Sequence, residues 1–291
     1  MDDKIIVTNR AALMSEYGSS GVQQIKASLA ALIAADAKRG IKTRLVHLDD
    51  AGAMKKLGVK ALGGANDHRG AKVAIDGIFK KLAPDYLVIL GSVDVVPHQK
   101  LTNPAYKAGD DDDRYALSDL PYACDVPYGT DPAGFVGPTR VVGRLPDLTG
   151  ADEPSHIVAL LKTAASWTSR PDSDYAPFGL SAAVWQGSTQ LSMENVFGND
   201  KSPLLSPPKG PKHSAAALGA RMHFINCHGG RAAPEFYGQQ GKAYPLALTT
   251  KTASGAIRPG TVASVECCYG AELYDSVTLE IDVPICQSYL R

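Results

Sequence analysis

The chain has 291 residues, and its 30 Lys or Arg residues balance 30 Asp or Glu residues, so the formal net charge is zero. This length suits one large α/β domain or two subdomains. Hydrophobic residues make up 44% and charged residues 21%, which excludes wholesale disorder and fibrous classes. The balanced charge argues against a nucleic-acid binder. No apolar run approaches the ~20 residues of a membrane span, so we expect no membrane partner.

The five cysteines are irregularly spaced, and two of them are adjacent. An odd number in a chain of this length argues against a disulfide framework. The paired Cys-x-x-Cys spacing of a zinc site does not occur. The N-terminal residues lead directly into an apolar strand, without the features of a signal peptide. We therefore expect reduced thiols, a cytoplasmic protein and no metal site.

Short apolar runs alternate with helical patterns along the first half of the chain. Runs of strand length occur at residues 4–8, 45–48, 86–90 and 139–143. Apolar residues at helical spacing occur at residues 22–33, 73–82 and 157–164. Between residues 91 and 138 this regularity lapses. The alternation favours an α/β fold, with a mostly parallel sheet and helices on both faces.

A linker-like segment at residues 169–179, rich in Ser, Pro and Asp, divides the chain. Three further strands are expected beyond it, at residues 181–185, 222–226 and 261–265. We therefore expect an N-terminal α/β subdomain over residues 1–170 and a second subdomain over residues 171–291.

Two strands of the second subdomain end on reactive side chains that glycine follows. The first leads into Cys227-His228-Gly229-Gly230, and the second leads into Glu266-Cys267-Cys268-Tyr269-Gly270. The carboxyl ends of parallel strands face the crevice where ligands bind, so neighbouring strands would bring a histidine and a cysteine together. Such a pair is the minimum for acyl transfer by a thiol nucleophile. Either residue alone is also typical of a buried structural side chain.

The segment Glu266-Cys267-Cys268-Tyr269-Gly270 resembles the nucleophile motif of caspase-like cysteine peptidases, which carry a His-Gly pair upstream, as at His228-Gly229. Three earlier segments resemble the gingipain-type branch of that clan, at residues 87–97, 118–122 and 141–146. The resemblance implies a caspase-like three-layer sandwich, preceded by a smaller α/β subdomain. It also implies a cysteine endopeptidase that acts on peptides or proteins and needs no cofactor.

The spacing leaves open which cysteine is the nucleophile. Glycine stands three residues after Cys267 and two residues after Cys268, and the family contains both arrangements. Cys268 fits the motif better, because the small Cys267 then precedes the nucleophile and the acidic Glu266 stands two residues before it. We expect a dyad of Cys268 and His228. The backbone N–H groups of Gly229 and Cys268 would form the oxyanion hole.

The resemblance to clostripain and metacaspases implies that Glu266 lines the pocket for the side chain that precedes the cleaved bond. A carboxylate there favours Arg or Lys. Alternatively, Glu266 pairs with a structural arginine or contacts only substrate backbone, and the related legumain prefers asparagine with glutamate at this place. Glu194 is a second candidate for the pocket acid, as in gingipains. Gln186 stands roughly where the family has a carboxylate for the histidine, so the third catalytic residue is open.

Two features of the sequence suggest a calcium site and proteolytic processing of the chain. The run from Asp110 to Asp113 offers oxygen ligands for calcium but lacks the spacing of an EF-hand loop, so a solvated acidic run is the alternative. The chain stops at Arg291, before the last strand of a caspase-like fold. We therefore expect self-cleavage after Arg291 and a C-terminal companion chain from the same precursor, or else an artificial end.

Two rival functions remain. The first is a catalytically inactive caspase-like module that binds peptides or regulates a partner. The second is an unrelated α/β enzyme that uses a nucleotide or phosphate. Against the second, neither a Gly-x-Gly-x-x-Gly nor a Gly-x-x-x-x-Gly-Lys-Ser/Thr pattern follows a strand.

Overall fold

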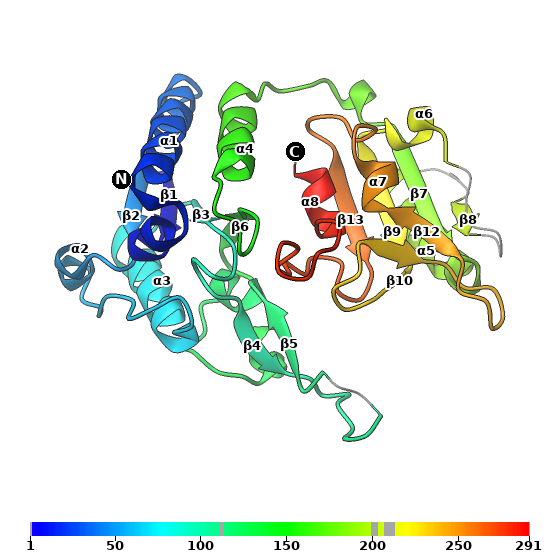
Figure 1. The fold of residues 1–291 in the computed structure, drawn as a ribbon, viewed down its shortest axis with the longest axis horizontal. Coiled ribbons are helices and arrows are strands. Elements are labelled where there is room, and N and C mark those ends of the chain that lie inside the picture. The colour runs from blue at the N-terminus through cyan, green and yellow to red at the C-terminus, as the bar shows by residue number, and fades with distance from the viewer. Residues whose placement is uncertain (1, 111–112, 199–202, 207–212, 291) are drawn as a thin grey trace. The chain divides into compact units, whose positions relative to one another are not determined.

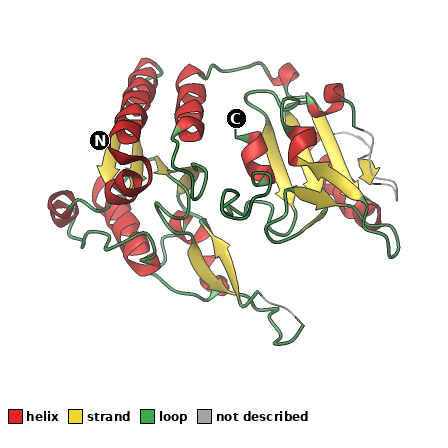
Figure 2. Cartoon of the chain, in the orientation of Figure 1, coloured by secondary structure: helices red, strands yellow, loops and turns green. Residues whose placement is uncertain are grey.

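The chain divides into two compact units, Met1–Ser166 and Trp167–Arg291 (Figure 1). The computed structural model describes residues 2–110, 113–198, 203–206 and 213–290. Each unit is built on a parallel sheet with flanking helices (Figure 2), which confirms the predicted α/β class. The division follows Ser166, whereas the sequence predicted it after residue 170.

The first unit contains a four-stranded sheet in the order β2-β1-β3-β6, in which all neighbouring strands are parallel. Its strands are β1 (Lys4–Thr8), β2 (Thr43–His47), β3 (Tyr86–Leu90) and β6 (Val141–Leu145). Its α-helices are α1 (Arg10–Lys38), α2 (Ala51–Lys56), α3 (His68–Leu82) and α4 (Ser155–Ser166). The irregular segment holds a hairpin of β4 (Gln99–Thr102) and β5 (Tyr115–Ser118), and two 3₁₀ turns at Leu120–Ala123 and Pro132–Phe135.

Helices cover both faces of this sheet. The strands β2 and β3 lie on opposite sides of β1, and connections between parallel strands are right-handed, so α1 and α3 lie on opposite faces. Helix α4 packs beside α1. As a result β1 is covered on both sides, and Ile5, Ile6 and Val7 have no exposed surface.

Side-chain caps determine where the helices of the first unit begin. Asn9, Asp50 and Asp67 each accept a hydrogen bond from the backbone N–H three residues later, at 3.1, 2.9 and 2.8 Å. A cap of this kind satisfies an N–H group that has no partner within the helix, and is worth about 1 kcal/mol. The sequence therefore encodes the start of α1, α2 and α3 locally.

A partly buried ion pair ties the irregular segment of the first unit to its sheet. Arg144 on β6 donates to both carboxylate oxygens of Asp119 at 2.7 Å. It also donates to the carbonyl oxygens of Gly91 and Val96, both at 2.8 Å. Burial opposes ionisation of Asp119, but the Arg144 guanidinium holds the pKa of that carboxyl below its usual value. Asp119 is thus a scaffold residue of the first unit.

Acid should destabilise the first unit through His98, whose Nε2 lies 3.8 Å from an Asp119 oxygen. Burial lowers the pKa of His98 from 6.5 to about 4, against the opposing effect of Asp119. Between these values the unfolded chain binds a proton that the folded chain excludes, so stability is lost as the pH falls from 6.5 toward 4. The loss is about 3 kcal/mol at most. Between about pH 7 and about pH 4.5, the urea midpoint should fall further for the wild type than for His98→Gln. If the urea midpoint falls equally in the two proteins, protonation of His98 is not what destabilises the first unit in acid.

The second unit contains a four-stranded sheet in the order β13-β9-β7-β8, again with all neighbours parallel. Its strands are β7 (Pro177–Ala182), β8 (Leu204–Ser206), β9 (Met222–Asn226) and β13 (Val262–Glu266). A small antiparallel sheet consists of β10 (His228–Gly229), β11 (Glu235–Tyr237) and β12 (Leu246–Thr249). The α-helices are α5 (Gln186–Phe197), α6 (Ala215–Leu218), α7 (Thr250–Ala253) and α8 (Ile285–Tyr289). Nowhere in the described ranges is there a helix with the length and apolarity to cross a membrane.

The strand β7 lies earlier than the sequence predicted, because residues 183–185 form a 3₁₀ turn and not the end of a strand. Pro177 occupies the first strand position, where the missing N–H of proline is tolerated. Gly179 allows α5 to pack closely, since a Cβ there would lie 2.2 Å from the Met193 sulfur. Pro177 and Gly179, which lie in the linker-like segment at residues 169–179, therefore belong to the strand β7.

Candidate active site

The strands β9 and β13 are neighbours in the sheet of the second unit. They pair in parallel, and Glu266, the last residue of β13, lies opposite Asn226, the last residue of β9. The chain segments that follow them, with His228 and Cys268, therefore leave the sheet at the same edge. The sequence prediction depends on these two strands being neighbours, and their parallel pairing meets that condition.

The histidine and cysteine segments touch at their backbones. A Cβ on Gly229 would lie 1.7 Å from the carbonyl oxygen of Cys268, so only glycine allows this approach. A second link lies beyond it, where the N–H of Ala232 donates to a carboxylate oxygen of Glu272 at 2.7 Å. The structure thus brings His228, Gly229 and Cys268 to one place at the carboxyl edge of the sheet.

Both segments contain strained backbone. Ala232 has φ of 48° and Tyr269, which directly follows Cys268, has φ of 57°. Residues other than glycine adopt the left-handed region at a cost of roughly 1–3 kcal/mol, and such residues cluster at functional sites. Here the two positive φ values occur in the two segments that meet.

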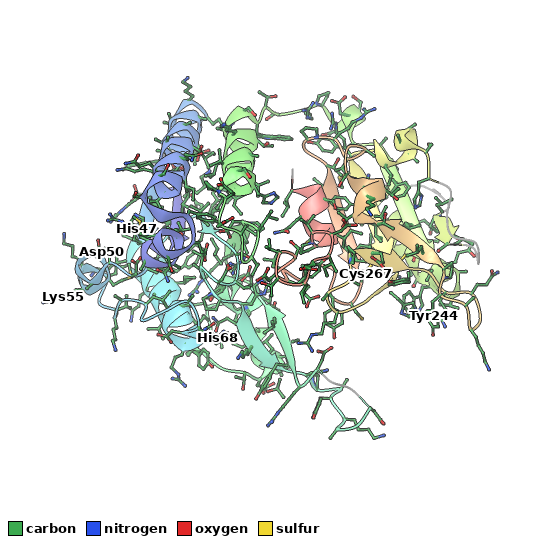
Figure 3. All side chains as sticks on the ribbon, viewed as in Figure 1. His47, Asp50, Lys55, His68, Tyr244 and Cys267 are labelled. Atoms are coloured by element: carbon green, nitrogen blue, oxygen red, sulfur yellow. The ribbon has the colours of Figure 1, made fainter. Side chains whose placement is uncertain are left out.

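The two adjacent cysteines differ in accessibility. Cys268 is exposed, whereas Cys267, which is labelled in Figure 3, is partly buried and packs against the apolar core of the second unit. Burial and the nearby Cys227 raise the pKa of the Cys267 thiol far above its ordinary value. Burial raises the pKa of Cys227 to about 12. The thiolate is the reactive form of cysteine, and the raised pKa of Cys267 opposes its formation. Cys268 is therefore the better candidate for the nucleophile, because its thiol is exposed.

Alternation along β13 accounts for this difference. Ala263, Val265 and Cys267 line a cavity of about 500 Å³, together with Ile285 and Tyr289 of α8. The intervening side chains point to the other face of the sheet, because successive residues of a strand alternate. Glu266 lies on that other face and is exposed, as Cys268 is.

The two candidate pocket acids lie in different places. Glu266 is exposed at the end of β13, directly before the cysteine pair. In the part of the chain that the structure describes, each arginine ion pair goes to an aspartate, so Glu266 pairs with no structural arginine. Glu194 lies about 12 Å along the axis of α5 from Gln186, where the helix begins. There Glu194 accepts a hydrogen bond from Gln190 at 3.2 Å. This hydrogen bond lies within α5.

The imidazole of His228 has a polar partner and two aromatic neighbours. Its Nε2 lies 2.7 Å from the side-chain oxygen of Gln239. The ring of Trp185 packs at 4.3 Å and 44°, and the edge of Tyr244 packs at 5.2 Å and 71°, between ring centroids. Gln186, which the sequence suggested for the place of the histidine's carboxylate, starts α5 with an exposed side chain. No sequence pattern marks Gln239, because it lies in a loop; Trp185 was missed although it directly precedes Gln186.

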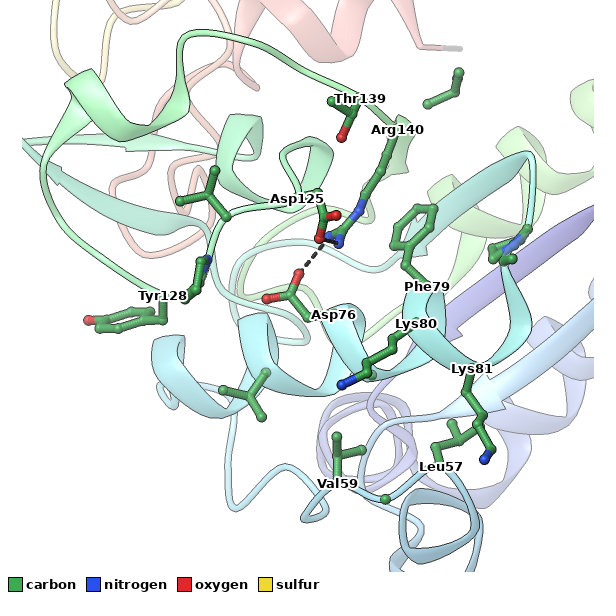
Figure 4. Close-up of a pocket in the computed structure, with 18 of the residues that line it drawn as sticks. Leu57, Val59, Asp76, Phe79, Lys80, Lys81, Asp125, Tyr128, Thr139 and Arg140 are labelled. Carbon is green, nitrogen blue, oxygen red and sulfur yellow. Dashed lines mark hydrogen bonds and ion pairs between the residues drawn. The ribbon is translucent and has the colours of Figure 1, made fainter.

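The first unit holds a larger cavity of about 1290 Å³, shown in Figure 4. Arg140 lies between Asp76 and Asp125, at 2.6 and 2.7 Å, and over the ring of Phe79. The fully buried Lys72 donates to Asp76 at 2.5 Å. The charged groups of this network are paired with one another, and Asp76, Asp125 and Arg140 line the wall of the cavity.

The calcium alternative concerns the acidic run in the first unit. Asp111 and Asp112 lie outside the described residues, and the carboxylate of Asp110 pairs with Lys107. Among the side chains that are described, no three His, Cys, Asp or Glu residues are grouped to hold a metal ion. The run therefore adds no argument for calcium.

Comparisons with protein-family models, with curated proteins and with solved structures find no match to this chain. The resemblance to caspase-like peptidases consequently rests on the sequence motifs alone.

Proposed function

We propose that the protein is a caspase-like cysteine endopeptidase that cuts after Arg or Lys, with Cys268 as nucleophile and His228 as general acid and base. The observation that carries this proposal is the contact between Gly229 and the Cys268 backbone at the shared edge of β9 and β13. This contact joins the segment of His228 and Gly229 to Cys268, and the two sequence motifs identify these residues independently. A free, exposed thiol at such a site suits a reducing compartment, such as the cytoplasm.

The proposed mechanism follows from these groups. The Cys268 thiolate attacks the scissile carbonyl carbon, and the backbone N–H groups of Gly229 and Cys268 stabilise the oxyanion. His228 takes the proton of the Cys268 thiol and gives it to the leaving amine as the acyl-enzyme forms. It then removes a proton from the water that attacks the thioester, which releases the acid and restores the thiolate beside a protonated imidazole.

A companion chain fits the same proposal. Strand β13 lies at the edge of its sheet and pairs, among the described strands, with β9 alone. An edge strand offers unpaired N–H and C=O groups that a further strand would satisfy. We propose that a strand from the same precursor extends the sheet here, which would complete a caspase-like three-layer sandwich. The expected cleavage position, Arg291, lies outside the described residues.

The alternative function is an inactive module that binds peptides. One observation favours it, because the partner of His228 is the neutral amide of Gln239 where the resembled family has a carboxylate. Fluorogenic peptides with Arg, Lys, Asn or Asp before the reporter, with and without a chelator, separate the two. Hydrolysis of the Arg and Lys peptides that is lost in His228→Ala supports the peptidase. Peptide binding without hydrolysis supports the inactive binding module. Loss of hydrolysis in the presence of a chelator would indicate that the activity requires calcium.

Replacing Glu266 by glutamine should alter the specificity for basic residues. A partly desolvated pair between a carboxylate and Arg contributes about 1.5–3 kcal/mol, so kcat/KM for the Arg peptide should fall roughly 10- to 100-fold. The rate for the Asn peptide should change much less, and the ratio of the two is the measurement. Glu194→Gln is the matched control, since Glu194 lies in the third turn of α5. If the ratio of the Arg rate to the Asn rate falls in Glu194→Gln and not in Glu266→Gln, Glu194 is the pocket acid.

A further inference from the structure

We propose that Gln239 is a positioning residue for His228. Its amide oxygen holds the imidazole in the tautomer with the proton on Nε2 and leaves Nδ1 as the atom that takes and gives the proton. This inference rests on the proposed function, because the choice of nitrogen matters for proton transfer to and from the Cys268 site.

The hydrogen bonds of Gln239 determine its amide orientation. Its Nε2 donates to the carbonyl oxygen of Gly241 at 3.1 Å, which turns its Oε1 toward His228. That oxygen lies 2.7 Å from the imidazole Nε2. An amide oxygen only accepts hydrogen bonds, so the imidazole Nε2 must carry the hydrogen. A neutral imidazole has a single N–H, and its lone pair is then on Nδ1.

The backbone around Gln239 is held on two sides. Its carbonyl oxygen accepts a hydrogen bond from the N–H of Val184, at 3.3 Å. The next residues form a tight turn, in which Gln240 and Ala243 exchange two backbone hydrogen bonds at 3.0 and 3.1 Å. Gly241 has φ of 60°, which the turn requires. Gln239 therefore occupies a defined position in the connection between β11 and β12.

Two aromatic rings restrict the imidazole further. Trp185 packs on it from the segment that Val184 anchors, and Tyr244 contacts it from the same loop as Gln239. These rings limit the plane of the imidazole, but neither distinguishes Nδ1 from Nε2. The hydrogen bond to Gln239 supplies that distinction, which is why we assign the tautomer to this residue.

The test reads His228 directly, in full-length protein with ¹⁵N-labelled histidine and the Cys268→Ala substitution. Removing the thiol prevents coupled titration with the imidazole. In this background we expect the Nε2–H tautomer to predominate in ¹H–¹⁵N spectra. Gln239→Ala should give a mixture of tautomers. Gln239→Glu should move the titration midpoint of the imidazole up by about one unit or more, because a full negative charge then faces Nε2.

Gln240→Glu is the matched control, because it adds the same charge one residue away on an exposed side chain. It should leave the tautomer unchanged and move the midpoint much less than Gln239→Glu does. An unchanged tautomer in Gln239→Ala, or equal midpoint shifts in the two Glu variants, would overturn the proposal.

Activity gives a separate readout. With Cys268 present, Gln239→Ala should lower kcat for the Arg peptide roughly 10- to 100-fold and leave KM within about twofold, since a misplaced proton donor slows chemistry more than binding. A loss confined to KM would overturn the positioning role. If the wild type cleaves none of the peptides, the proposed function fails, while the spectra still decide whether Gln239 sets the tautomer.

Discussion

Replacing Cys268 by alanine is expected to abolish peptide hydrolysis, with kcat lowered by ~10³-fold or more, because no other group forms the acyl-enzyme. The matched variant is Cys267→Ala, one residue away. Cys267 points into the apolar cavity beside Val265, and burial raises the pKa of its thiol. Cys267→Ala should therefore keep kcat within a few-fold of wild type, and any loss should appear as reduced stability. The measurement is kcat for the Arg peptide, with circular dichroism to verify folding.

Alkylation provides an independent measurement on the same pair. Brief treatment with iodoacetamide followed by peptide mass spectrometry should label Cys268 first, because its thiol is exposed while Cys227 is buried. The His228→Ala variant should slow that labelling, since the proposed dyad activates the thiol. If Cys267→Ala abolishes hydrolysis and Cys268→Ala does not, the nucleophile is Cys267 and the pocket acid must be reassigned.

The sequence identified the parts of the site that lie at the ends of long apolar strands. The strand predicted at residues 222–226 matches β9, and the strand predicted at 261–265 is shifted by one residue from β13. The strand β9 is buried over most of its length, whereas Val262, Ser264 and Glu266 of β13 are exposed, so the apolar signal is stronger for β9. The fold class alone does not determine that these two strands are neighbours; their observed pairing does.

The parts of the site that the sequence did not identify lie outside such strands. The strands β10, β11 and β12 have two to four residues each, too few to show an alternation. Gln239 lies in the loop between two of them, and its role depends on a tertiary contact with His228. Trp185 likewise contacts the imidazole only because β7 ends in a 3₁₀ turn.

The segments that resemble the gingipain-type branch have a structural role in the first unit. Arg144 joins Asp119 to carbonyl groups of the segment that follows β3, so three stretches distant in sequence form one partly buried network. Removing one partner of such a pair leaves a buried charge uncompensated. In this region the residues Arg144 and Asp119 therefore hold the unit together, and the chemistry proposed here depends on the second unit.

The strongest test of the site geometry is Gly229→Ala. Its Cβ would lie 1.7 Å from the carbonyl oxygen of Cys268, a backbone atom that no side-chain rotation moves away. The histidine and cysteine segments must then separate by an ångström or more. Since a misplacement of about 1 Å can cost 10²-fold in rate, kcat/KM for the Arg peptide should fall by about two orders of magnitude or more. The displaced N–H of Gly229 would also weaken the proposed oxyanion hole.

The matched control is Gly230→Ala, one residue further along. A Cβ there would lie 3.2 Å from the Cβ of Ala233, a side-chain contact that small shifts relieve. Gly230→Ala should therefore retain activity within a few-fold of wild type, and both variants should show wild-type circular dichroism. Because Gly229 lies between His228 and the Cys268 backbone, a fully active Gly229→Ala protein would mean that the two segments do not meet during the reaction. The thiol and the imidazole would then have to act without this contact, and the proposed geometry of the site, with Gly229 in the oxyanion hole, would be wrong.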